Sequence, residues 1–244
     1  MPHALKRAPE KLLIASAGRR ISVVIKRNPR ARRIILRVDE ALGLPILTLP
    51  SRTSLTHGED FLRCNLSWLE ERLQRLSPPS PFAHGGMFPL RGSPCRILFR
   101  RGRGIVTLER RESGLVLNVP GEPEFLARRV KEWLRREARR DLKRAVMRHA
   151  DALGRKPKGI RIGDPKSRWG SCSSTGVLTF SWRLVLAPTK VLDYLAAHET
   201  AHLKEMNHGP KFWAWVEKLD PDYEAARAWL NKGGVALSAV GRAA

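Results

Sequence analysis

Three of the chain's seven histidines fall within eleven positions near its C-terminal end. His198 and His202 are four residues apart, so on a helix both imidazoles project from one face and can bind the same metal ion. Glu199, beside the first histidine, can reach a water molecule at that metal without binding the metal itself. In this HExxH arrangement zinc acidifies the water, and the glutamate takes its proton as the water attacks a peptide carbonyl. The pattern predicts peptide-bond hydrolysis at a zinc site, with Glu199 as the general base.

A catalytic zinc needs a third protein ligand and one open position for water. His208 follows His202 by six residues, and at about 100° per residue it would point some 240° away if the helix continued. Asn207 tolerates the left-handed turn that ends helices, and Gly209-Pro210 prevents regular helix from running on. We therefore expect the helix to end so that His208 returns to the metal. The alternative third ligands are the nearby carboxylates Glu205, Glu217 and Glu224.

Two other interpretations of these histidines are an exposed amphipathic helix and a structural zinc site. Ala196, Ala197 and Ala201 favour a tightly packed, buried helix instead, where unpaired charge is costly and a metal supplies a partner. A structural zinc would need four protein ligands, and Cys172 is the one plausible fourth. The chain's three cysteines show no CxxC spacing, which argues against a cysteine zinc cluster and a disulfide framework. A reducing cytoplasm is the expected location.

Positive charge dominates the composition, with 46 Lys and Arg against 23 Asp and Glu, a formal net charge of +23. Residues 1–150 hold 32 basic and 14 acidic side chains, a net of +18, so the excess is N-terminal. Such a field attracts polyanions, because displaced counterions drive phosphate contacts whatever the base sequence. DNA or RNA is therefore a candidate partner. The alternative is a surface whose charge serves only solubility.

Two segments of the first 150 residues share one pattern, two β-rich runs followed by a helix. In the first, residues 32–38 and 44–50 are β-rich, and residues 61–76 carry leucines at helical spacing. In the second, residues 103–120 supply two strands and residues 124–150 a longer helix with arginines on its polar face. The order indicates an internal ββα duplication. The matching pairs are Phe61-Leu62 with Phe125-Leu126, and Trp68-Leu69 with Trp133-Leu134.

The last part of the chain predicts a compact catalytic domain in a protein of α+β class. Residues 158–188 hold short β-like runs broken by Gly, Ser and Asp, typical of a small antiparallel sheet with tight turns, and helices follow. No apolar run approaches the ~20 residues of a membrane-spanning helix, so no membrane partner is expected. The expected segments are a disordered N-terminus (1–20), a basic region of two ββα units (21–150), a zincin-like metallopeptidase domain (151–234) and a flexible tail (235–244).

Residues 168–230 resemble the YgjP-like family of zinc-dependent metallopeptidases. The elements RWGSCS, a strand, an HExxH helix and NHxxxFW occur in order and at compatible spacing, and the ββα repeats also resemble that family's N-terminal part. The resemblance implies that His198, His202 and His208 bind zinc and that Glu199 is the general base. It further suggests kinship with SprT-like and Wss1-like proteases, some of which act on proteins crosslinked to DNA. Thr200 departs from the family, which usually has an aliphatic residue there.

The segment before the histidines supplies further candidate residues. Trp169, Gly170 and Ser171 are candidates for substrate binding, since a strand edge there would accept an extended peptide; the alternative is a tight hairpin with a core tryptophan. Arg168 and Tyr223 are candidates for stabilising an oxyanion. The next helix is expected to pack over the HExxH helix through three aromatic residues, Phe212, Trp213 and Trp215.

The leading hypothesis is therefore a zinc-dependent metallopeptidase acting on protein or peptide substrates. The alternative is a nucleic-acid-binding protein with a vestigial or structural metal site. The two combine in a protease that DNA or RNA recruits to its substrates.

Overall fold

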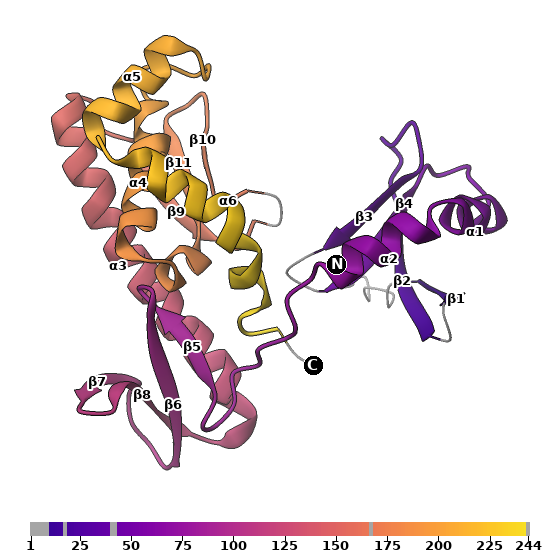
Figure 1. Cartoon of the computed structure of the whole chain (residues 1–244), viewed down its shortest axis with the longest axis horizontal. Helices are drawn as coiled ribbons and strands as arrows, with labels where there is room; N and C mark the ends of the chain where they lie inside the picture. The colour runs from indigo at the N-terminus through magenta and orange to yellow at the C-terminus, as the bar shows by residue number, and fades with distance from the viewer. Residues whose placement is uncertain (1–9, 17–18, 40–42, 166–167, 243–244) are drawn as a thin grey trace, which may run out of the picture. The chain divides into compact units, whose positions relative to one another are not determined.

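The computed structural model describes residues 10–16, 19–39, 43–165 and 168–242 (Figure 1). The chain forms two compact units, Met1–Ser77 and Pro78–Ala244. Helices and small sheets occur in both units, as expected for an α+β protein. Within the described ranges, no helix combines the length and the apolar character needed to cross a membrane.

The first unit is a four-stranded sheet with two helices. The strand order is β1-β2-β4-β3, in which the central pair β2–β4 is parallel and both outer pairs are antiparallel. Leucines of the helices, Leu62 and Leu69, are fully buried with Leu47 and Leu49 of the sheet. The elements are β1 (Lys11–Ser16), β2 (Arg19–Arg27), β3 (Ile35–Asp39), β4 (Leu44–Leu49), α1 (Leu55–Cys64) and α2 (Leu66–Gln74).

The second unit opens with a sheet of the same topology. Its strand order is β5-β6-β8-β7, again with a parallel central pair and antiparallel outer pairs. The two sheets share this topology, with four strands before the helices of each unit instead of the two predicted; the duplication itself stays a prediction, and of its matched tryptophans Trp68 is 45% exposed whereas Trp133 is buried. Leu126 and Leu134 are buried like their predicted counterparts Leu62 and Leu69. The elements are β5 (Met87–Leu90), β6 (Ser93–Arg101), β7 (Thr107–Arg111), β8 (Gly114–Gly121) and α3 (Leu126–Leu153).

The remaining elements form the part that carries the histidines. In the three-stranded sheet β11 lies between β10 and β9, so β10 is an edge strand. The expected antiparallel pairing holds for β10–β11, whereas β9 and β11 are parallel because the chain passes through the far edge strand β10 between them. The elements are β9 (Gly159–Gly163), β10 (Gly170–Cys172), β11 (Val177–Ser181), the 3-10 helix η2 (Trp182–Leu186), α4 (Thr189–Ala201), α5 (Pro210–Leu219) and α6 (Tyr223–Ala239).

Helix α3 joins the second sheet and the histidine-bearing part into one unit. It ends at Leu153, and its C-cap residue Gly154 has a φ of 69°, the left-handed conformation that glycine adopts without strain. Its apolar stripe packs against β8 near one end and against η2 and α4 along its length. One hydrophobic cluster extends from Phe82 to Val240. The compact unit therefore begins at Pro78, whereas the catalytic domain was predicted to begin at residue 151. The difference arises because helical periodicity shows that one face of α3 is buried but does not show which elements cover it.

Both expected terminal segments contain regular structure. Strand β1 occupies residues 11–16 of the segment expected to be disordered, and residues 1–9 lie outside the described residues. Helix α6 continues through Ala239, and Leu237 and Val240 are buried. The buried Arg183 guanidinium donates to the carbonyl oxygens of both, at 3.0 and 2.6 Å. Most of the described part of the expected tail is thus anchored to the core.

Candidate metal centre

Helix α4 places the predicted HExxH residues inside the second unit. It follows Pro188, which caps its N-terminus, and packs against α3, α5, α6 and β10. Ala196, Ala197 and Ala201 are fully buried, and their small side chains allow these neighbours to approach closely. The helix is therefore buried, as the alanines predicted, and is not an exposed amphipathic helix.

Three imidazoles converge at the C-terminal end of α4. Candidate ligand atoms of His198, His202 and His208 all lie within 4.8 Å of one another. The Nε2 atoms of His198 and His208 are 3.2 Å apart. Two ligands at tetrahedral angles about a zinc ion, each ~2.0–2.1 Å from it, lie about 3.3 Å apart, so this spacing suits a shared metal. Across the described residues, this group includes none of the other candidate ligands, which are Cys172, Glu205, Glu217 and Glu224.

The return of His208 depends on where α4 ends. The helix stops at Ala201, and His202 is its C-cap residue. The N–H groups of Leu203 and Lys204 then bond to carbonyl oxygens three residues back, at 3.0 Å each, which tightens the last turn. Asn207 does not have a positive φ, so its predicted left-handed turn was wrong. The helix has already ended by then, and the loop to Pro210, where α5 begins, carries His208 back.

Local contacts set the protonation of two of the histidines. The Nδ1 of His202 lies 3.0 Å from the Glu205 carbonyl oxygen, and because a carbonyl only accepts, Nδ1 donates and Nε2 keeps its lone pair. Burial, together with the neighbouring His202 and His208, lowers the pKa of His198 to about 3. Burial also lowers the pKa of His202. Both rings are thus held neutral, which is the form that binds a metal.

The ring of Phe212 packs against all three imidazoles and forms the floor of the site. Its ring centroid lies 4.9 Å from that of His198, 4.4 Å from that of His202 and 4.7 Å from that of His208. The side chain is fully buried on α5. Phe212 was predicted to pack α5 over α4, but its direct contact with every candidate ligand was not predicted. Such contact restricts the orientation of the rings.

Glu199 is a buried carboxylate with an unsatisfied oxygen. Its side chain is nearly inaccessible, and within the described part of the chain Oε2 has no hydrogen-bond partner. Burial raises the pKa of Glu199 to about 8, although the positive charge of Arg168 opposes that shift. A nearby cation would therefore stabilise this carboxylate in its ionised form.

Gly170 of the edge strand β10 leaves the room that Glu199 occupies. A Cβ atom placed on Gly170 would lie 2.5 Å from Oε1, 2.7 Å from Cγ and 2.9 Å from Cδ of Glu199, closer than real Cβ contacts. Gly170 was predicted to take part in substrate binding. Its contact with Glu199 was missed, and the glycine itself was the one available signal.

The other candidate residues occupy different positions around the centre. Trp169 packs against the core and against Gly234 of α6, in line with the core-tryptophan alternative, while Ser171 lies on the edge strand β10. Arg168 is exposed and close enough to Glu199 to influence its pKa. Tyr223 stacks on Tyr194 and Trp213, with ring centroids 6.2 and 5.5 Å apart.

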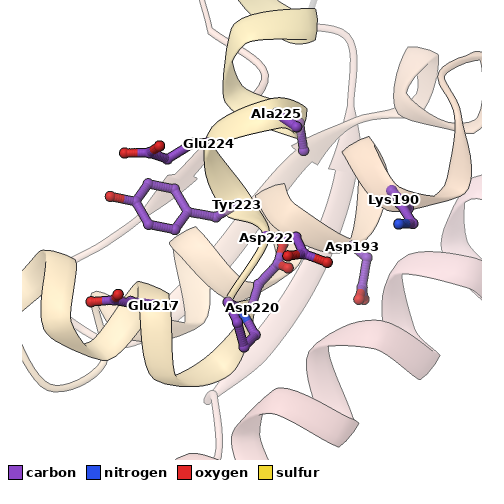
Figure 2. Close-up of a pocket in the computed structure, with 10 residues that line it drawn as sticks. Lys190, Asp193, Glu217, Asp220, Asp222, Tyr223, Glu224 and Ala225 are labelled. Atoms are coloured by element: carbon purple, nitrogen blue, oxygen red, sulfur yellow. The ribbon is translucent and has the colours of Figure 1, made fainter.

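Tyr223 therefore lies one layer behind His198, since the two rings on which it stacks, Tyr194 and Trp213, each contact that histidine with a centroid distance of 5.9 Å. It lines an acidic pocket of about 730 Å³ together with Asp193, Glu217, Asp220 and Glu224 (Figure 2).

A helix with two histidines and a buried glutamate, a third histidine returning from the next loop and an adjoining edge strand define a metallopeptidase-type site. The family comparison agrees with this class. The YgjP-like metallopeptidase domain matches residues 32–233, and the chain belongs to this family. It is accordingly a peptidase with a metal centre, and His198, His202 and His208 are near enough to bind one ion.

Among solved structures, part of the chain is similar to the crystal structure of the metallopeptidase zymogen of Pyrococcus abyssi abylysin. The identity is 24% and the TM-score 0.35, over 38% of this chain and 95% of that one. Comparison with curated proteins found no match.

Proposed function

We propose that the chain hydrolyses peptide bonds at a zinc ion held by His198, His202 and His208, with Glu199 as the general base. The observation that carries the proposal is the buried, unpartnered Oε2 of Glu199 on the same helix end as the converging imidazoles. A buried carboxylate without a partner is costly, and such groups cluster at functional sites. Imidazole ligands suit zinc well.

Zinc bound at the histidines would supply a Lewis acid that polarises the substrate carbonyl and lowers the pKa of water. Glu199 accepts the proton of the attacking water at its carboxylate and then donates it to the departing amine nitrogen. Burial alone favours the neutral acid form of Glu199. The positive charges of Arg168 and of a bound metal act in the opposite direction and favour the ionised carboxylate, which can act as a base.

The substrate peptide is proposed to lie along the edge strand β10. This strand pairs with β11 on one side, and its other side offers main-chain groups at Gly170 and Ser171 for strand addition. Glu199 packs against Gly170, so a peptide on this edge would pass beside the proposed base. Arg168, which is exposed and lies shortly before the strand, is close enough to Glu199 to lower its pKa, whereas Tyr223 lies behind the histidine layer.

Metal analysis and hydrolysis of three variants test the proposal. Wild-type protein and Glu199→Gln should each hold one equivalent of zinc, and only the wild type should cleave a degenerate peptide library. His208→Ala should lose both zinc and cleavage. Glu217→Gln, which removes an exposed alternative ligand, is the matched control and should change neither. Zinc-free wild type, or cleavage by Glu199→Gln, would contradict the assignment.

A further inference from the structure

The N-terminal half of α3 and the loop between β6 and β7 enclose a groove of about 620 Å³. Its cationic lining consists of Arg128, Arg129 and Arg136, and its lining carboxylate, Glu132, is already ion-paired with Arg128 at 3.1 Å. Arg129 donates to the Gly104 carbonyl oxygen at 2.6 Å, which ties the loop to the helix. The groove is therefore positively charged, and the hydrogen bond from Arg129 holds the β6–β7 loop in place along one side of it.

Apolar side chains are exposed beside these cations. Ile105, which lines the groove, is 79% exposed, although isoleucine is usually buried. Phe125, at the start of α3, is 45% exposed, and the Arg128 guanidinium lies over its ring, 5.0 Å from the centroid. The groove thus combines cations with exposed apolar surface. A surface whose charge served only solubility would have no need of exposed apolar side chains.

A stripe of free cations continues from the groove along α3. Arg136, Arg139 and Lys143 are spaced three and four residues apart, so they share one helix face, and all three are exposed. Within the described residues, none of the three has a carboxylate at ion-pairing distance. The stripe spans about 10 Å at 1.5 Å per residue.

We propose that this α3 groove and the α3 stripe (Arg136, Arg139 and Lys143) bind single-stranded nucleic acid. Phosphates pair with the stripe and the groove arginines, and an unpaired base lies against Ile105 and Phe125. A duplex would reach the cations but would keep its base faces stacked inside, so the exposed apolar side chains favour a single strand. An acidic peptide would likewise match the charge but leave the apolar surface unused.

This surface is separate from the metal centre within the second unit. The β5–β8 sheet lies beside the N-terminal end of α3, while α5, which carries Phe212, lies near the opposite end of the helix (Figure 1). A helix of 28 residues is about 42 Å long. Substitutions in the stripe therefore leave the histidines and Glu199 in place, and Glu199→Gln should bind nucleic acid as the wild type does.

Fluorescence anisotropy of the full chain with labelled oligo-dT, oligo-rU and a DNA duplex of equal length tests the proposal. The wild type should bind the single strands more tightly than the duplex. The triple variant Arg136→Gln, Arg139→Gln, Lys143→Gln should weaken single-strand binding at least tenfold at moderate salt. The slope of log Kd against log salt should fall by about 2, from three contacts at ~0.7 each.

Two further variants distinguish binding at this surface from a nonspecific effect of the protein's net positive charge. The triple Arg155→Gln, Lys156→Gln, Lys158→Gln removes the same charge from an exposed segment beyond the C-terminus of α3, and should stay within twofold of the wild type. Ile105→Ser should weaken single-strand binding several-fold with the salt slope unchanged, and should leave duplex binding as it was. Circular dichroism verifies the fold of each variant.

Several outcomes would overturn the proposal. These are equal losses in the two triple variants, tighter binding of the duplex, displacement of oligo-dT by polyglutamate at equal charge, and absence of binding near 50 mM salt. A difference between oligo-dT and oligo-rU would identify DNA or RNA as the preferred ligand. Loss of hydrolysis in Glu199→Gln has no bearing on these results, so the two proposals fail independently.

Discussion

Replacing Gly170 with alanine should separate metal binding from hydrolysis. The three atoms nearest to the added Cβ all belong to Glu199, and the shortest distance, to Oε1, is 2.5 Å. Ordinary contact begins at 3.4 Å, so the carboxylate must shift by about 0.9 Å or the strand must move. A misplacement of about 1 Å costs on the order of 100-fold in rate. We expect kcat/KM to fall by about that factor, with one zinc still bound.

The assay is hydrolysis of the peptide that the wild type cleaves fastest from a degenerate library, alongside zinc analysis and thermal melting. Gly159→Ala is the control, because Gly159 lies in the same sheet and its added Cβ would contact Val177 Cγ1 at an ordinary 3.9 Å. Full activity in Gly170→Ala would refute the steric reasoning. Loss of zinc from Gly170→Ala would show that the glycine supports the histidines rather than Glu199.

Three further predictions concern the support of the site. Phe212→Leu, which thins the floor under the imidazoles, should lower zinc affinity about 10-fold in competition with a chelator, while Trp215→Leu on the same helix should not. Removal of zinc by chelation should lower the melting temperature, since zinc at 100 times its Kd stabilises the folded state by about 2.7 kcal/mol; His208→Ala should show no such response. Arg183→Met should lower the free energy of unfolding in urea by about 3 kcal/mol, because it breaks a 3.0 Å ion pair with Asp164 and the bonds to Leu237 and Val240; an unchanged value would show that α6 is anchored by apolar packing alone.

The convergence of the histidines was predictable from local spacing. Residues four apart share a helix face whatever surrounds the helix, and Gly209-Pro210 signalled a break before α5. The residue at which α4 ends was predicted wrongly, at Asn207 instead of Ala201. The last turn tightens through backbone bonds of Leu203 and Lys204, which carry no distinctive side-chain signature.

The supporting contacts could not be predicted because they join residues that are distant in sequence. Gly170 is 29 positions before Glu199, and the two residues come together only because β10 packs against α4. Phe212 follows an apolar pattern that any packed helix shows, so its contact with three imidazoles depends on the angle between α4 and α5. A glycine or an aromatic residue marks such a position in the sequence without indicating its partner.

The pairing of charges on α3 explains why the net charge alone did not locate a binding surface. Glu137 and Asp141 point toward the inner side of α3, where both bind Arg91 at 2.7 Å. Asp193 of α4 binds Arg148 and His149 near the other end of the helix. These carboxylates hold the sheet and α4 against α3, and Glu137 and Asp141 also pair with the exposed Arg140, so their charge is taken up away from the α3 stripe. The contacts that fix the metal-binding helix therefore also leave the α3 stripe with its charge uncompensated.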